Sequence, residues 1–251
     1  MKLAIIFNLF CYWLGIVPGW DKCTRASCWD GRDAERRMMN ILSPYFSDEK
    51  FEEYVKWMED RGCNTAHVFL ANEGDGEGSG YYATDATKLS QKRIKYLRVH
   101  GFAVVAWLMA DDSPSYASAM FAHPREYVQD LKDKGLLEHV SFIVLGLEMN
   151  EKSFRDGATH WPIVAQVVRE LLPRMKIGVH HTSGHLDYAE LGDIVCDQLS
   201  PGVATPARIR ESVNRIRSMG KQAIGFEYDR HPNRERAEAA LQAGAFSVGN
   251  W

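Results

Sequence analysis

Apolar runs recur along the chain at intervals of roughly 30 residues. Their β-branched content and their lack of polar alternation are typical of strands buried on both faces of a parallel sheet. The clearest run leads straight into a carboxylate, Glu148. The pattern predicts eight strands, at Leu3–Phe10, Thr65–Asn72, Phe102–Met109, Phe142–Asn150, Ile177–Ser183, Ile194–Ser200, Gln222–Tyr228 and Ala245–Trp251.

Between these runs, apolar residues recur at helical spacing. Ser47 is a plausible N-cap of the first long helix, and Pro162 falls in the first turn of another, where proline is tolerated. Glycines close four of the helices, at Gly62, Gly101, Gly220 and Gly244. The predicted helices are Ser47–Arg61, Ser90–His100, Pro124–Leu137, Thr159–Leu172, a short one near Tyr188–Leu191, Pro206–Met219 and Asn233–Ala243.

Strictly alternating strands and helices imply right-handed crossovers and a parallel sheet. Eight units in a chain of 251 residues match an α/β fold with one (β/α)8 TIM barrel over residues 1–251. The alternative is an open doubly wound sheet, although no glycine fingerprint for a nucleotide follows the first strand. The eighth helix is missing. It is dispensable, or Arg32–Leu42 replaces it, or the chain is one domain of a longer protein.

Composition narrows the classes of partner. The net charge is −3, from 30 basic and 33 acidic residues, so no basic footprint for nucleic acid is present. The apolar segment Leu3–Val17 resembles a signal peptide but lacks a small-x-small cleavage site, and no other run approaches membrane-spanning length. We expect a monomer without a nucleic-acid or membrane partner. Secretion and association with a virion both stay open.

The five cysteines do not indicate a disulfide framework, since their number is odd and their spacing irregular. Cys63 and Cys196 are predicted to be small core residues, the first at a helix end and the second in a strand. The chain has no paired C-x-x-C, and therefore no signal for structural zinc.

In a (β/α)8 barrel, catalytic residues lie at the C-terminal ends of the strands. The predicted strand ends carry carboxylates, amides, imidazoles and an aromatic ring, without a set at metal-ligand spacing, so no metal or cofactor is expected. His180 and His181 are adjacent on one strand and point to opposite faces, so only one can face the barrel centre. The residues at these ends are Asn8, Asn72, Glu73, Asp111, Asp112, Glu148, Asn150, His180, His181, Asp197, Gln198, Glu227, Tyr228 and Trp251.

Two of these carboxylates follow similar apolar strands, Glu148 after the fourth and Glu227 after the seventh. For either glutamate considered alone, the simplest interpretation is a structural ion pair with an arginine or lysine. Hydrolysis of a glycosidic bond uses two carboxyl groups that face each other across a cleft, one protonated and one ionised. Mutual repulsion and unequal burial would separate their pKa values.

At this point the chain resembles the clan A glycoside hydrolases, which carry catalytic glutamates after strands four and seven. The resemblance implies that Glu148, in Gly-Leu-Glu-Met-Asn, is the acid/base and that Glu227, in Gly-Phe-Glu-Tyr, is the nucleophile. Trp251 matches the tryptophan that the clan commonly places under the sugar at the end of strand eight. The other residues expected to bind substrate are Asn8, Asn72, Asp111, Asn150, His180 and Tyr228.

One position departs from the clan pattern. Leu147 stands where the clan usually has an asparagine for the sugar 2-hydroxyl, a role left open to Asn150 or His180, and Glu151 is a rival for the acid role. The alternatives are a catalytically inactive carbohydrate-binding barrel, or a metal-dependent hydrolase that uses His180, Asp111 and Asp197.

The first hypothesis is a retaining hydrolase of β-glycosidic bonds within a polysaccharide. Strands four and seven lie roughly opposite each other in such a barrel, so the two carboxyl groups should converge to about 5–5.5 Å, the separation of a retaining enzyme. Aromatic side chains on the long loops are candidate platforms for sugar rings: Trp13, Trp20, Trp29 and Tyr81.

Overall fold

The structure is a computed structural model of the chain. It describes residues 48–60, 65–70, 84–108, 120–150, 157–182, 184–199, 203–226 and 234–249.

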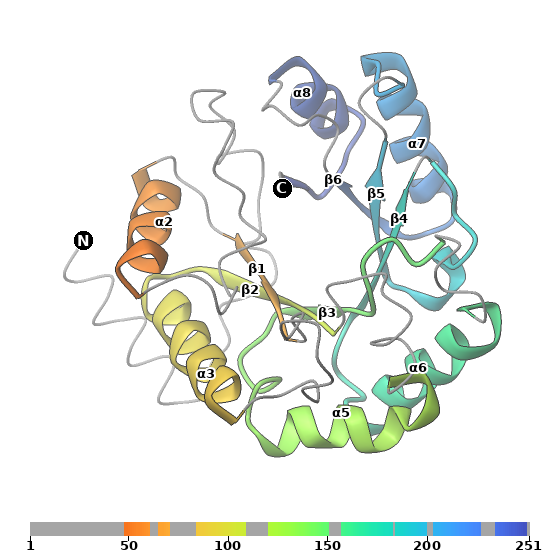
Figure 1. The fold of residues 1–251 in the computed structure, drawn as a ribbon. Coiled ribbons are helices and arrows are strands. Elements are labelled where there is room, and N and C mark those ends of the chain that lie inside the picture. Colours follow the sequence, from red (N-terminus) through yellow and green to blue (C-terminus); the bar gives the residue numbers. More distant parts are fainter. Residues whose placement is uncertain are drawn as a thin grey trace.

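The core of the fold is a seven-stranded sheet in which every pair of neighbours is parallel. The strands follow one another in the sheet in their order along the chain, and the sheet is curved (Figure 1). The strands are β1 Thr65–Phe69, β2 Ala103–Trp107, β3 Phe142–Val144, β4 Ile177–Thr182, β5 Ile194–Gln198, β6 Gln222–Phe226 and β7 Ser247–Gly249.

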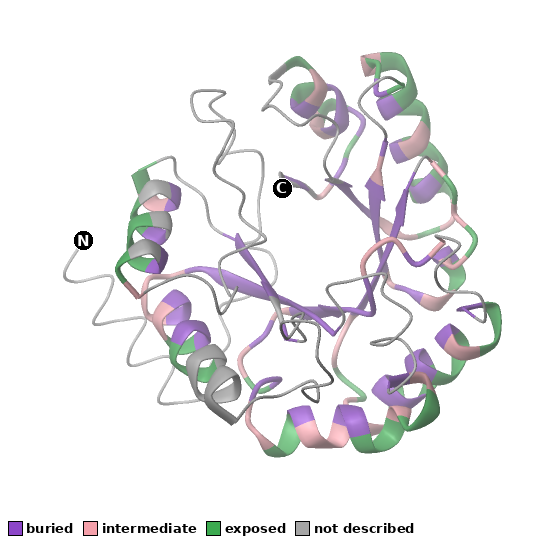
Figure 2. Ribbon diagram, viewed as in Figure 1, coloured by how far each residue is buried: buried purple, intermediate pink, exposed green. Residues whose placement is uncertain are grey.

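The helices cover the convex side of this curved sheet. Figure 2 shows exposed residues on their outward surfaces and buried residues along the strands. Pro206 opens α7, and the Thr205 hydroxyl accepts the N–H of Arg208 as an N-cap. The helices are α2 Asp48–Asp60, α3 Thr84–Val99, α5 Pro124–Asp133, α6 Gly157–Leu171, the 3-10 helix η3 Ala189–Leu191, α7 Pro206–Ser218 and α8 Arg234–Gln242.

Sequential strand order with helices on one side is typical of part of a (β/α)8 barrel. A doubly wound sheet would reverse its strand order at a switch point and carry helices on both faces. The described strands show no reversal, so the doubly wound alternative is wrong for this part of the chain. The predicted first strand, Leu3–Phe10, and its pairing with the last strand lie outside the described residues.

Four of the predicted strands continue past the observed ends, which are Phe69 of β1, Trp107 of β2, Val144 of β3 and Gln198 of β5. The largest difference concerns β3, which ends at Val144 although the apolar run continues to Leu147. Helix α3 begins six residues before the predicted Ser90, at Thr84. Helix α6 begins at Gly157, so Pro162 lies inside the helix and not in its first turn.

Side chains alternate between two apolar layers. Val104 and Ala106 of β2 join the large cluster under the helices, whereas Val105 and Trp107 join a smaller cluster on the concave side. Both layers are buried, which explains why the strands lack polar alternation. The smaller, inner cluster contains Val105, Trp107, Phe142, Val144, Ile194, Cys196 and Ile224.

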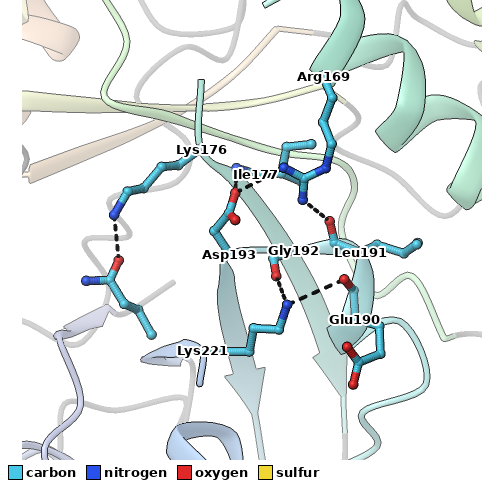
Figure 3. Close-up of polar contacts among 9 residues, drawn as sticks. Arg169, Lys176, Ile177, Glu190, Leu191, Gly192, Asp193 and Lys221 are labelled. Atoms are coloured by element: carbon cyan, nitrogen blue, oxygen red, sulfur yellow. Dashed lines mark hydrogen bonds and ion pairs between the residues drawn. The ribbon is translucent and has the colours of Figure 1, made fainter. Parts of the chain in front are cut away.

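Polar contacts at the N-terminal ends of the strands tie β4, β5 and β6 together (Figure 3). The Asp193 carboxylate accepts the Ile177 N–H at 3.0 Å and lies 3.6 Å from Nη1 of Arg169 on α6. Lys221 Nζ, just before β6, donates to the carbonyl of Gly192 at 2.8 Å. These contacts are at the opposite edge of the sheet from Glu148, which corresponds to the end that usually serves stability in barrel proteins. Within the described part of the chain, no helix is long and apolar enough to cross a membrane.

Candidate functional site

Glu148 lies in a turn four residues beyond the end of β3. The sequence placed it at the end of the strand itself, so this detail was wrong, although its position at the C-terminal edge of the sheet holds. Its φ is 48°, and it is the one non-glycine residue with positive φ in the described ranges. A side chain in this left-handed region costs about 1–3 kcal/mol and persists where the surroundings hold it.

His180 on β4 holds this turn from the inner side. Its Nδ1 accepts the main-chain N–H of Glu148 at 2.8 Å. Its own carbonyl accepts the N–H of Met149 at 3.0 Å. One residue therefore fixes two consecutive peptide groups around the carboxylate candidate.

Asn150 makes a second connection to β4, through Thr182. The Asn150 Oδ1 accepts the Thr182 N–H at 2.9 Å, and its Nδ2 lies 3.2 Å from the Thr182 hydroxyl. Predicted as a substrate residue, Asn150 uses both ends of its carboxamide inside the protein. Its visible role is to hold the turn.

Trp161 on α6 supports the turn from the outer side. The indole is fully buried, and its Nε1 donates to the carbonyl of Met149 at 3.2 Å. A Cβ added to Gly146 would lie 2.5 Å from Cη2 of this ring, closer than any real contact. Only glycine fits there, which explains the glycine inside an otherwise apolar run.

An uncharged polar layer lies beneath the turn, on the concave side of the sheet. The Trp107 Nε1 donates to Nδ1 of His67 at 3.0 Å, and the Trp107 ring meets His180 edge-on with centroids 5.2 Å apart. Burial lowers the pKa of His67 to about 3. Burial, followed by the proximity of His181 and His67, lowers the pKa of His180 to about 3. Both imidazoles are therefore neutral at ordinary pH.

The hydrogen bonds also assign the tautomers of the two rings. Indole and peptide N–H groups only donate, so Nδ1 of His67 and Nδ1 of His180 are both acceptors. A neutral imidazole has one acceptor and one donor, and the proton of each ring is therefore on Nε2. The sequence did not single out His67 or Trp107, because each reads as an ordinary member of a buried strand.

His181 and Asp197 lie on the other side of the sheet. They are register partners on β4 and β5, and the Asp197 carboxylate accepts the hydroxyl of Ser212 on α7. His181 accepts the Tyr188 N–H through Nε2 at 3.0 Å. Asp197 is thus separated from His180 by the sheet, so the alternative metal site of His180, Asp111 and Asp197 cannot form as given. The expectation that the two adjacent histidines diverge is confirmed.

Two further inner positions bear on the site. The Leu147 side chain packs against the inner cluster, at the position of the clan asparagine. Gln198 ends β5 beside Thr182 and Phe226, and its Oε1 is buried without a hydrogen-bond partner. Cys196, below it, is a buried free thiol whose pKa is raised by burial, as predicted for a core residue.

The remaining predicted site residues fall outside the described ranges. They are Glu227, Asn8, Asn72, Asp111, Tyr228 and Trp251, together with Glu151, Cys63 and the aromatic residues Trp13, Trp20, Trp29 and Tyr81. Among the residues that the structure does describe, no group of three or more His, Cys, Asp or Glu side chains could hold a metal ion.

Comparison with known proteins identifies the fold. Neither models of protein families nor curated protein sequences match the chain. Among solved structures, the Ignisphaera aggregans GH53 catalytic domain has a TM-score of 0.56 at 13% identity, over 78% of this chain and 76% of that one. The exo-beta-1,4-mannosidase Op5Man5 from Opitutaceae bacterium strain TAV5 has a TM-score of 0.64 at 14% identity, over 84% of this chain. The chain spans about half the length of that enzyme, 49%.

The same fold occurs outside the glycosidases. A glycerophosphodiester phosphodiesterase from Parabacteroides distasonis has a TM-score of 0.50 at 14% identity, over 86% of this chain and 90% of that one. At such identities the likeness establishes the fold, and activity must be argued from the site. The chain is thus similar in fold to glycoside hydrolases built on parallel α/β barrels, with Glu148 at the edge of the sheet where barrel enzymes carry their catalytic groups.

Proposed function

We propose that the protein is a retaining glycoside hydrolase that cleaves β-glycosidic bonds in a polysaccharide. The observation that carries the proposal is the backbone of Glu148. A strained carboxylate residue, held by contacts from β4 and α6 at the C-terminal edge of a parallel sheet, is the kind of feature that catalysis retains. The fold likeness to glycoside hydrolases supports the same reaction class.

In this mechanism Glu148 is the acid/base and Glu227 is the nucleophile. Glu227 follows directly after Phe226, the last residue of β6. It attacks the anomeric carbon while Glu148 gives its proton to the leaving oxygen, and Glu148 then takes a proton from the water that releases the sugar. These two steps need the carboxyl groups of Glu148 and Glu227 about 5–5.5 Å apart. Trp251 would stack under the sugar ring, and Asn8, Asn72, Asp111 and Tyr228 would bind its hydroxyls.

The reaction uses no metal or cofactor. Each step is proton transfer or displacement at the anomeric carbon, and two carboxyl groups perform both. The substrate is the partner of this site, and we propose that the protein acts on it as a monomer.

The test is a panel of plant and bacterial polysaccharides, assayed for new reducing ends with and without a chelator. Glu148→Gln and Glu227→Gln should each lower kcat by at least about 100-fold. Glu190→Gln, at the opposite end of the barrel, is the control and should retain activity (Figure 3). Azide should partly restore Glu148→Ala on an activated substrate, with retained configuration in the product. An inverted first product from the parent enzyme would contradict the mechanism.

A carbohydrate-binding barrel without activity is the second candidate, and Leu147 favours it. Its side chain packs against the inner cluster and supplies no amide for a sugar 2-hydroxyl. Binding of a glycan by calorimetry, without any hydrolysis by the parent protein, would select this candidate over the enzyme.

A further inference from the structure

The turn that carries Glu148 depends on a histidine 32 residues away in the sequence. His180 supplies an acceptor to the N–H of Glu148 and a carbonyl to the N–H of Met149. The strained conformation and the imidazole acceptor therefore belong to one arrangement.

We propose that His180 is the positioning residue of the acid/base, acting as a neutral imidazole with its proton on Nε2. The inference rests on the proposed function for the role of Glu148. His180 does not exchange a proton with the substrate in this scheme. It fixes the backbone from which the Glu148 carboxyl reaches the leaving oxygen, and a displacement of about 1 Å at such a group can cost 100-fold in rate.

The neutral state of His180 is essential to this role, because an imidazolium has no acceptor on Nδ1. The surroundings favour neutrality. The ring is fully buried, it makes a T-shaped contact with the Trp107 ring at 5.2 Å between centroids, and its register neighbour on β5 is Cys196. The titratable groups around it in the described structure are His67 on β1, Cys196 on β5, Glu148 itself and, next along β4, His181.

Matched variants separate positioning from general support of the fold. His180→Asn keeps an acceptor close to the place of Nδ1, and His180→Phe keeps a ring of similar size without one. His181→Phe makes the same change one residue along the strand, where the ring accepts the Tyr188 N–H on the other side of the sheet. All three remove a buried imidazole from β4, so their folding costs are comparable.

The decisive kinetic readout is the dependence on the leaving group. His180→Phe should lose about 100-fold in kcat/KM on a glycoside with a poor leaving group, and less than about 10-fold on a dinitrophenyl glycoside, which needs no acid. His180→Asn should recover most of that loss and keep the pH profile of the parent, because His180 does not titrate in the working range. His181→Phe should change both substrates by the same factor. Equal losses on both substrates for His180→Phe would overturn the proposal.

A second readout does not depend on any activity. In ¹⁵N NMR spectra of the full chain, His180 should show an unprotonated Nδ1 and a protonated Nε2 from pH 7 down to about pH 4. The Glu148 amide should exchange more slowly in the parent than in His180→Phe. If the parent hydrolyses no glycoside, the proposed function fails and these spectra still test the arrangement. A protonated Nδ1 at neutral pH would refute it.

Discussion

The contact between Gly146 and Trp161 allows a quantitative test of how the site is supported. In Gly146→Ala the new Cβ would lie 2.5 Å from Cη2 of the indole and 3.2 Å from Cζ2. The indole of Trp161 cannot move without losing contacts. It is fully buried, its Nε1 donates a hydrogen bond to the carbonyl of Met149, and its ring makes a T-shaped contact with Phe121 at 4.8 Å between centroids. The turn or the indole must therefore move.

The cost follows from two effects. Overpacking of a close-packed interior typically costs about 1–3 kcal/mol. Movement of Trp161 away from Met149 also breaks a buried hydrogen bond, worth about 1 kcal/mol. We expect Gly146→Ala to lower the free energy of unfolding by about 2–4 kcal/mol, which is a large part of the stability of an ordinary domain.

The assay combines urea unfolding with kinetics. Because Gly146 is two residues from Glu148, kcat should fall by more than the loss of folded protein explains. Gly220→Ala is the control: it meets no atom within 4 Å, and its φ of 75° costs about 1–2 kcal/mol by strain alone, far from the site. That variant should lose stability and keep its kcat.

A double-mutant cycle completes the test. Trp161→Phe shortens the ring that the new Cβ would meet, so Gly146→Ala should cost about 1–2 kcal/mol less in that background than in the parent. Additive effects of the two substitutions would refute the argument that this contact determines the cost.

Two further predictions concern Asp197, on the outer face of the sheet, and Asp193, at the N-terminal ends of the strands. Burial raises the pKa of the Asp197 carboxyl to about 6 from 3.8, so between these values the native state keeps a proton that the unfolded state has lost. The free energy of unfolding should therefore fall by about 3 kcal/mol from this group as pH rises from below about 3 to above about 7, with about 2 kcal/mol of the fall between about pH 4 and 6, and Asp197→Asn should abolish that slope in urea titrations. Asp193→Ala leaves the Ile177 N–H without its acceptor and should lower the free energy of unfolding by about 1–3 kcal/mol. The kcat/KM of Asp193→Ala should equal that of the parent. A large loss would show that the N-terminal ends of the strands are coupled to the site.

The alternation of strands and helices could be predicted from the sequence, for local reasons. Pro124 and Pro206 begin helices where the sequence placed them, because a proline at the first turn needs no N–H partner. Gly220 and Gly244 end helices with positive φ, a conformation that glycine adopts freely. These properties belong to single residues and their neighbours along the chain.

The extent of β3 could not be predicted in the same way. The apolar run reaches Leu147, but the ladder ends at Val144, and the next residues turn between Trp161 on one side and the inner cluster on the other. A run that is apolar throughout does not reveal where hydrogen bonding to the neighbouring strand stops. That point depends on the neighbouring elements.

The sequence by itself determined that Glu148 ends an apolar run at the edge of a parallel sheet. The tertiary structure decided which polar residues lie beside Glu148. His180 faces inward and contacts it, whereas His181 faces the segment before η3 and Asp197 faces α7. A strand buried on both faces carries no polar alternation, so its sequence does not show which side is which. The left-handed backbone of Glu148 is likewise fixed by His180, 32 residues later, and only the packing of β4 beside β3 brings the two together.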